Sequence, residues 1–222
     1  MTSTPLAASR RVHARRWLVA TVLLYNVAHH LGFAVAPLGD VGHTRWGDWI
    51  DVLTPYTVLL SAAAALRAAG ADRRGWTLYL VGAVTYTEGH GIHLAANSVY
   101  NTAPGPTAHL WDETVGHYLW YAGTALVFAA LATAFARTPP PRTLLYLPFS
   151  LGVAVTWTTN SIEGATAFMG IAVAAAFTVW GWRTRQHLGR VLLPAFAPAL
   201  VMLTAYGGWY RGFPQPSHMG WI

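Results

Sequence analysis

Residues 76–98 read WTLYLVGAVTYTEGHGIHLAANS, an apolar segment that also carries one glutamate and two histidines. A bilayer core about 30 Å thick is crossed by a helix of about 20 predominantly apolar residues, so this segment is long enough to span one. Six other segments have the same character: residues 17–35, 52–69, 110–136, 144–159, 165–182 and 191–209. The sequence therefore predicts an all-α polytopic membrane protein, a single seven-helix transmembrane bundle formed by residues 1–222.

The composition agrees with a membrane protein. Of the 222 residues, 54% are hydrophobic and 10% are charged, whereas soluble domains carry roughly 25% charged residues. The chain contains no cysteine, which excludes disulfides, cysteine-ligated metals and a thiol nucleophile. All 14 basic residues are arginine, so a lysine Schiff base or a lysine general base is excluded as well.

The arginines predict the orientation, because cytoplasmic segments of membrane proteins carry an excess of basic residues. With a cytoplasmic N-terminus and seven spans, Arg45 and Arg211 lie outside. The other arginines lie inside: Arg10, Arg11, Arg15, Arg16, Arg67, Arg73, Arg74, Arg137, Arg142, Arg183, Arg185 and Arg190. We therefore expect an external C-terminus and a location in a bacterial-type plasma (inner) membrane. The basic isoelectric point reflects this topology and does not indicate a nucleic-acid partner.

Histidines and acids concentrate in the outer half of the predicted bundle. Ionisable residues at membrane depth are costly and usually face the bundle interior with a partner or a function. At 100° per residue, four polar side chains of the third span fall within an arc of about 60°. These are Tyr86, His90, His93 and Asn97; Glu113 with His117, and Asn160 with Glu163, form similar stripes on the fourth and fifth spans.

These stripes predict a metal site, because imidazole is a common ligand for zinc, iron and copper. The predicted ligands are His90, His93, His117 and His30. The predicted cofactor is a divalent metal, zinc first, with iron or copper as alternatives. The alternative interpretation is a set of buried histidines hydrogen-bonded to neighbouring tyrosine, asparagine and carboxylate groups. Which of His29 and His30 points inward stays open.

Glu113 and Glu88 are the candidate general bases. Glu88 lies roughly opposite the histidine face of an ideal helix, so it either serves a neighbouring pocket or turns inward at a π-bulge near Gly89 and Gly91. Asp112 is expected to complement the dipole at the start of the fourth helix. The candidate substrate-binding residues are Asn97, Asn160, Glu163, Arg211 and Tyr86.

The predicted function is a membrane-embedded metal-dependent enzyme that acts on a lipid or other hydrophobic small molecule in the outer, periplasmic half of the bilayer. A zinc hydrolase with a His/Glu site is the first hypothesis. A non-haem iron or copper oxidoreductase acting on an apolar chain is the alternative. Alternatives that are not enzymes are a metal or proton carrier and a histidine-rich structural membrane protein. A carrier would need polar residues that continue to the inner face, where the spans are almost purely apolar. The oligomeric state stays open.

Overall fold

The computed structural model describes residues 5–136, 138, 144, 146–184 and 189–221, and these residues are almost entirely helical, which confirms the all-α prediction. The helices are α1 (Pro5–Ala34), α2 (Trp46–Asp51), α3 (Thr54–Ala69), α4 (Arg73–Thr102), α5 (Pro106–His109), α6 (His117–Phe135), α7 (Tyr146–Glu163), α8 (Ala167–Arg183) and α9 (Gly189–Tyr210). A 3₁₀ turn, η1 (Ala36–Leu38), and a hairpin of β1 (Asp40–Val41) with β2 (Thr44–Arg45) connect α1 to α2. A π-helix, η2 (Leu110–Gly116), connects α5 to α6.

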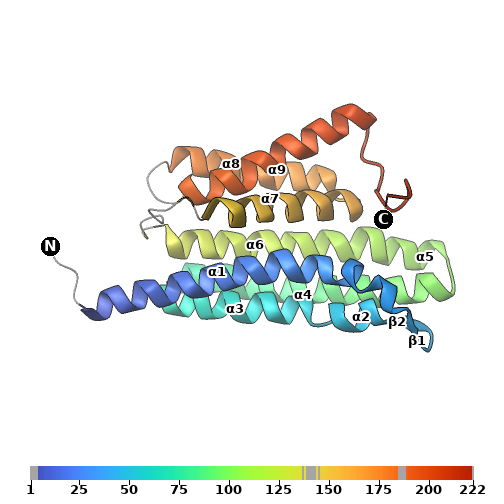
Figure 1. Ribbon diagram of the computed structural model, residues 1–222, viewed down its shortest axis with the longest axis horizontal. Coiled ribbons are helices and arrows are strands. Elements are labelled where there is room, and N and C mark those ends of the chain that lie inside the picture. Colours follow the sequence, from blue (N-terminus) through green and yellow to red (C-terminus); the bar gives the residue numbers. More distant parts are fainter. Residues whose placement is uncertain (1–4, 137, 139–143, 145, 185–188, 222) are drawn as a thin grey trace.

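The helices form two groups on either side of α6 (Figure 1). On one side, α4 packs along α6 and α1 packs on α3; on the other side, α7 and α8 both pack on α9. Contacts between α1 and α7 join the two groups. The N-terminus lies at one end of the molecule, whereas the β-hairpin, α5 and the C-terminus lie at the other (Figure 1).

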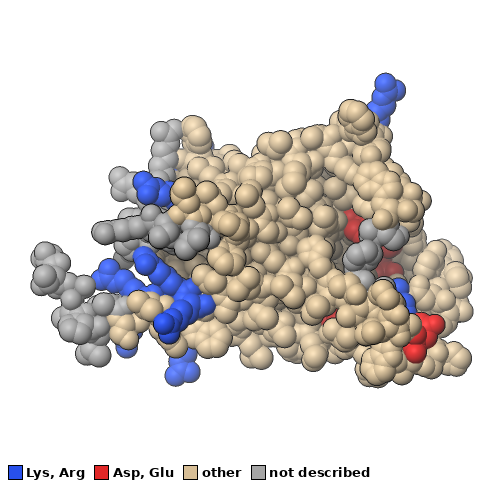
Figure 2. All heavy atoms as spheres, in the orientation of Figure 1, with Lys and Arg blue, Asp and Glu red and all other residues tan. Residues whose placement is uncertain are grey.

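Within the part of the chain that the structure describes, three helical stretches are long and apolar enough to cross a membrane: Trp46–Ala69, Pro106–Phe135 and Gly189–Tyr210. The helix α8 is apolar but shorter. Most of the basic residues visible on this face gather at the end that carries the N-terminus, whereas the acidic residues and some further basic residues lie toward the opposite end (Figure 2). The predicted inner residues Arg137, Arg142 and Arg185 lie outside the described residues. These features are consistent with a membrane protein.

The turn between α3 and α4 shows how local sequence sets the antiparallel arrangement. Gly70 ends α3 with φ of 71°, a left-handed conformation that glycine adopts without steric cost. Asp72 then caps α4, because its Oδ1 accepts a hydrogen bond from the Gly75 backbone N at 2.8 Å. A helix end and a helix start within three residues reverse the chain and place α4 beside α3.

The helix α4 and the η2–α6 segment approach each other along four glycines. Gly82 and Gly89 lie on α4, and Gly116 and Gly123 lie on the opposing segment. A Cβ added at Gly82 would lie 2.9 Å from the Gly123 carbonyl oxygen, and one added at Gly116 would lie 2.8 Å from the His93 backbone N. Only glycine fits at these two positions without a shift of the neighbouring backbone. Small residues therefore let the two backbones come into contact, as they do in membrane helix pairs.

This contact predicts that Gly123→Ala destabilises the protein by about 1–3 kcal/mol, because the new methyl would collide with the Tyr86 backbone. Gly91→Ala on α4 is the matched control, since its Cβ would meet nothing within 4 Å. We expect a lower Tm for Gly123→Ala in detergent and an unchanged or higher Tm for Gly91→Ala. Equal Tm values for the two variants would contradict the packing described here.

Candidate metal centre

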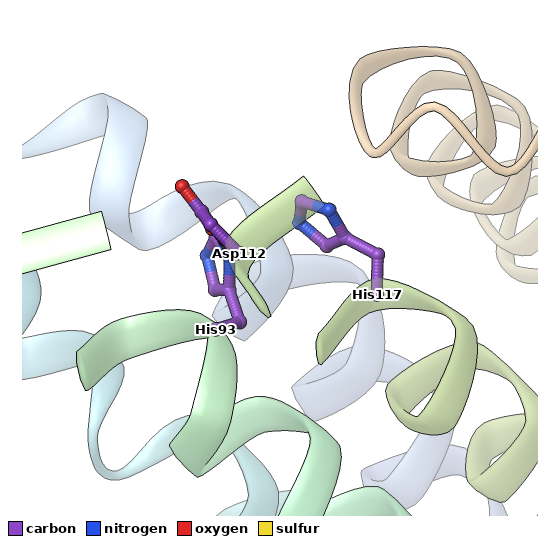
Figure 3. A group of neighbouring side chains, drawn as sticks. All are labelled: His93, Asp112 and His117. Carbon is purple, nitrogen blue, oxygen red and sulfur yellow. Dashed lines mark hydrogen bonds and ion pairs between the residues drawn. The ribbon is translucent and has the colours of Figure 1, made fainter. Parts of the chain in front are cut away.

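Three side chains from α4, η2 and α6 form a group that can hold a metal ion (Figure 3). His93 comes from α4, Asp112 from η2, and His117 is the first residue of α6. One potential ligand atom from each residue lies within 4.8 Å of the other two. Among the residues that the structure describes, no other trio of histidines and carboxylates comes this close.

Asp112 and His93 are already in direct contact. His93 Nδ1 lies 2.6 Å from Asp112 Oδ1, a short hydrogen bond in which the imidazole N–H donates to the carboxylate. Asp112 is 4% exposed and His117 is 5% exposed, whereas His93 is partly exposed, so two of the three side chains are buried. A buried carboxylate is costly without a partner, and the hydrogen bond to His93 compensates for the burial of the Asp112 carboxylate.

The π-helix brings Asp112 and His117 to the same face. In an α-helix, residues five positions apart point about 140° away from each other, because each residue advances 100°. A π-helix has i→i+5 hydrogen bonds, so residues five apart lie one above the other. Asp112 lies in the first turn of η2, as expected for an acid at a helix start, and its carboxylate is also hydrogen-bonded to His93. The π-geometry occurs in η2, whereas α4 stays α-helical at Gly89 and Gly91, so the alternative in which a π-bulge there turns Glu88 inward is not realised.

The donor set fits a transition metal. Two imidazoles and one carboxylate bind zinc in several hydrolases, and the same set forms the facial triad of non-haem iron enzymes. Bonds of about 2.0–2.2 Å place the ligands of one ion at most about 4.4 Å apart. The group, spread over 4.8 Å, therefore needs to contract only slightly around an ion.

Trp120 forms the aromatic floor of a larger histidine cluster. Its ring centroid lies 4.5 Å from that of His90, 5.3 Å from that of His93 and 5.8 Å from that of His117. His29 stacks on its other side at 5.4 Å. The indole therefore packs against four imidazoles of the cluster.

Glu113 lies next to the group but is not one of its three members. Its Oε2 is 3.7 Å from His117 Nδ1 and accepts a hydrogen bond from Gln215 Nε2 at 2.8 Å. Gln215 also donates to the Glu163 carbonyl oxygen, and the Glu163 carboxylate accepts from the Ser217 backbone N at 3.2 Å. The C-terminal segment thus holds both glutamates at the same end of the molecule. Sequence reasoning missed Gln215, because nothing in a loop glutamine signals a contact 102 positions away.

His90 belongs to the cluster but not to the three-residue group. Its Nε2 faces Asp51 Oδ2 at 3.4 Å, and the Asp51 Oδ1 accepts from Thr54 Oγ1 at 2.7 Å. The ring centroids of His90 and His93 are 6.3 Å apart. Of the four predicted histidine ligands, the structure therefore brings together His93 and His117 and replaces His90 by Asp112.

His30 also lies apart from the group. Its Nδ1 is 2.7 Å from the Asn26 carbonyl oxygen and its Nε2 is 3.5 Å from Thr159 Oγ1, so it faces α7. His29 points into the interior instead, with Nε2 3.0 Å from the Tyr86 hydroxyl. Glu88 is exposed on the opposite face of α4, where the unbroken helix keeps it away from the histidines.

The predicted substrate-binding residues are dispersed. Tyr86 is fully buried beneath the cluster and interacts with His29, and Asn97 accepts a hydrogen bond from Asn101 one turn further along α4. Arg211 is exposed, with φ of 53°, at the turn after α9. Asn160 and Glu163 remain near each other at the end of α7, and the Nδ2 of Asn160 is buried without a hydrogen-bond partner.

Comparison with protein-family models, curated proteins and solved structures finds no match to this chain. The fold and the site together define an all-helical protein with membrane-compatible helices and a His/Asp metal-binding group.

The geometry predicts that His93→Ala abolishes stoichiometric binding of zinc, because it removes one of three ligands and the partner of Asp112. His90→Gln is the matched control: it alters a neighbouring buried histidine outside the three-residue group and should retain the metal. Elemental analysis of both purified proteins measures the difference. Metal loss in His90→Gln together with retention in His93→Ala would contradict the assignment.

Proposed function

We propose that this protein is a membrane-embedded, metal-dependent enzyme that acts on a lipid or other hydrophobic small molecule. The observation that carries the proposal is the convergence of His93, Asp112 and His117 within 4.8 Å. Two imidazoles and one carboxylate leave coordination positions open, which suits a catalytic metal better than a structural one. Asp112 and His117 lie within Pro106–Phe135, a helical stretch apolar enough to cross a membrane, which supports a hydrophobic substrate.

Hydrolysis with zinc is the first form of the proposal. Zinc would supply Lewis acidity and lower the pKa of a coordinated water toward about 7. Glu113 is the candidate base, because its carboxylate lies 3.7 Å from the His117 ring while outside the three-residue group. In this role it accepts the proton of the attacking water and returns it to the leaving group. Gln215, through its hydrogen bond to Oε2, orients that carboxylate.

Oxidation with iron is the second form, because the same donor set also suits iron. Asp112 in place of a third histidine makes a set of two histidines and one carboxylate, the ligand set of non-haem Fe(II) oxygenases. The two forms differ in the metal and in the need for dioxygen. Glu113 is essential to the hydrolytic form, whereas the oxidative form assigns it no proton-transfer role.

A seven-span topology with a cytoplasmic N-terminus in a bacterial-type plasma membrane completes the proposal. Each of the seven predicted spans falls largely within a helix of its own: α1, α3, α4, α6, α7, α8 and α9. The gathering of basic residues at the N-terminal end supports this orientation (Figure 2). The metal-binding group lies toward the opposite, external end, which is also where the C-terminal segment contacts Glu113.

Glu113→Gln tests the hydrolytic form. We expect this variant to keep its zinc, because Glu113 is not one of the three ligands, and to lose hydrolysis of a long-chain fluorogenic ester by about 100-fold or more. Elemental analysis and ester cleavage, measured on the same preparation, separate binding from chemistry. Zinc loss in Glu113→Gln would make Glu113 a ligand. Iron as the native metal, with oxygen consumption and no ester cleavage, would favour the oxidative form.

The topology is tested with a reporter fused at the C-terminus. Seven spans and a cytoplasmic N-terminus place that reporter outside, so a periplasm-active enzyme should be active there and a cytoplasm-dependent fluorescent protein should be dark. The matched control is the same reporter inserted in the α3–α4 turn, after Gly70, which the topology places inside. Cytoplasmic signals at both positions would contradict an odd number of spans.

A further inference from the structure

A groove of about 330 Å³ opens on the side of the molecule between the α2–α3 region and α4. Small-molecule sites have volumes of roughly 300–1,000 Å³, so the groove has room for one slender ligand. Its walls are mainly apolar and include Val52, Pro55, Tyr56 and Leu94. Tyr56 is 49% exposed and Val52 is 44% exposed, so the walls face outward, toward the surroundings of the helix bundle.

His90 lies at the floor of this apolar groove. Its side chain is 1% exposed, and its Nε2 has no hydrogen-bond partner of good geometry. The nearby carboxylate oxygen of Asp51, at 3.4 Å, faces the same nitrogen. At this distance the pair has no well-formed hydrogen bond, and a buried polar atom that lacks one is costly. An imidazole N–H beside a carboxylate is suited to one hydroxyl group, which accepts from the nitrogen and donates to the oxygen.

Gly91 keeps the groove open above His90. Glycine weakens a helix interior, and Gly82 and Gly89 on the same helix are required by contact with the η2–α6 segment. Gly91 has no such requirement: it is exposed, and a Cβ there would meet nothing within 4 Å. It lines the groove, where a larger side chain would occupy the space over the imidazole.

The groove also leads toward the metal-binding group. His90 separates the two, with its ring centroid 6.3 Å from that of His93. A chain that lies in the groove with its polar end at His90 therefore has that end next to the candidate metal centre. Anionic head groups are disfavoured at His90, because the Asp51 carboxylate lies 3.4 Å from its Nε2. Asp48, which also lines the groove, is already paired with Arg45 at 2.7 Å and leaves no free charge for a cationic head group.

We propose that this lateral groove binds a neutral long-chain amphiphile, with its chain between the α2–α3 region and α4 and its hydroxyl group at His90. The proposal deepens the proposed function by naming the class of substrate and its path of entry from the bilayer. The ligand's role as a substrate rests on the proposed function. Binding of the ligand in the groove does not, because it requires no metal.

The test is photo-crosslinking of the full chain in lipid nanodiscs with a long-chain alcohol that carries a terminal diazirine. We expect saturable labelling of the segment 87–98, competed by unlabelled alcohol and much less by the carboxylate or the amine of the same chain length. Gly91→Phe should reduce this labelling by about tenfold or more, because the ring occupies the ligand's volume. Val84→Phe is the matched control, an exposed position of α4 outside the groove, and should label like the wild type.

The proposal would be overturned if labelling does not saturate or spreads equally over the exposed helix faces. It would also be overturned if labelling persists in Gly91→Phe, or if the carboxylate or the amine competes and the alcohol does not. Should the Tm of Gly91→Phe show that it has not folded, Ala95→Leu, which lies exposed on the same wall, replaces it. The experiment is repeated on His93→Ala. Retained labelling there, with no metal bound, supports the groove independently of the metal centre, whereas lost labelling overturns a binding site that needs no metal.

Discussion

The close approach of α4 to the η2–α6 segment is the constraint on which the rest of the structure depends. Its four glycines bring the backbones into contact, and at one of these contacts Gly116 touches the backbone of His93. That contact puts a histidine of one helix beside the first residue of the other, His117. Without it, the imidazoles of His93 and His117 would be separated by the side chains that normally space two packed helices, at interaxial distances of 8–10 Å. In this protein the packing of the core and the assembly of the candidate metal centre are therefore the same interaction.

The π-helix η2 makes the second essential adjustment. It is placed immediately before α6, so α6 continues undisturbed while Asp112 is rotated onto the His117 face. A π-turn is a rare conformation, and it is found disproportionately at functional sites. Here it coincides with a buried carboxylate whose short hydrogen bond to His93 compensates for its removal from water. The π-geometry of η2 and the burial of Asp112 therefore have one explanation: together they position the Asp112 carboxylate beside His93 and His117.

The polar residues around the histidine cluster come from separate segments. His90 of α4 lines the lateral groove and faces Asp51 of α2, Trp120 of α6 lies against the histidine rings, and Glu113 of η2 is hydrogen-bonded to Gln215. Gln215 and Ser217 of the C-terminal segment hold Glu113 and Glu163 by hydrogen bonds, so this segment is tied to the same region.

The sequence by itself determined the helical class, the apolar segments and the segregation of arginines from acids, because length, hydropathy and charge are properties of contiguous residues. It also determined that His93 and His117 share a region with Glu113, since helical periodicity places residues on faces. The tertiary structure alone decided which side chains meet. Asp112 replaced His90 through a local change from α- to π-geometry, which no hydrophobic pattern encodes. His29 took the interior position in place of His30, Asp51 and Gln215 arrived from distant segments, and Glu88 stayed on the outer face. Contacts of this kind depend on the distance and rotation between helices, which are set by packing and not by the period of any one segment.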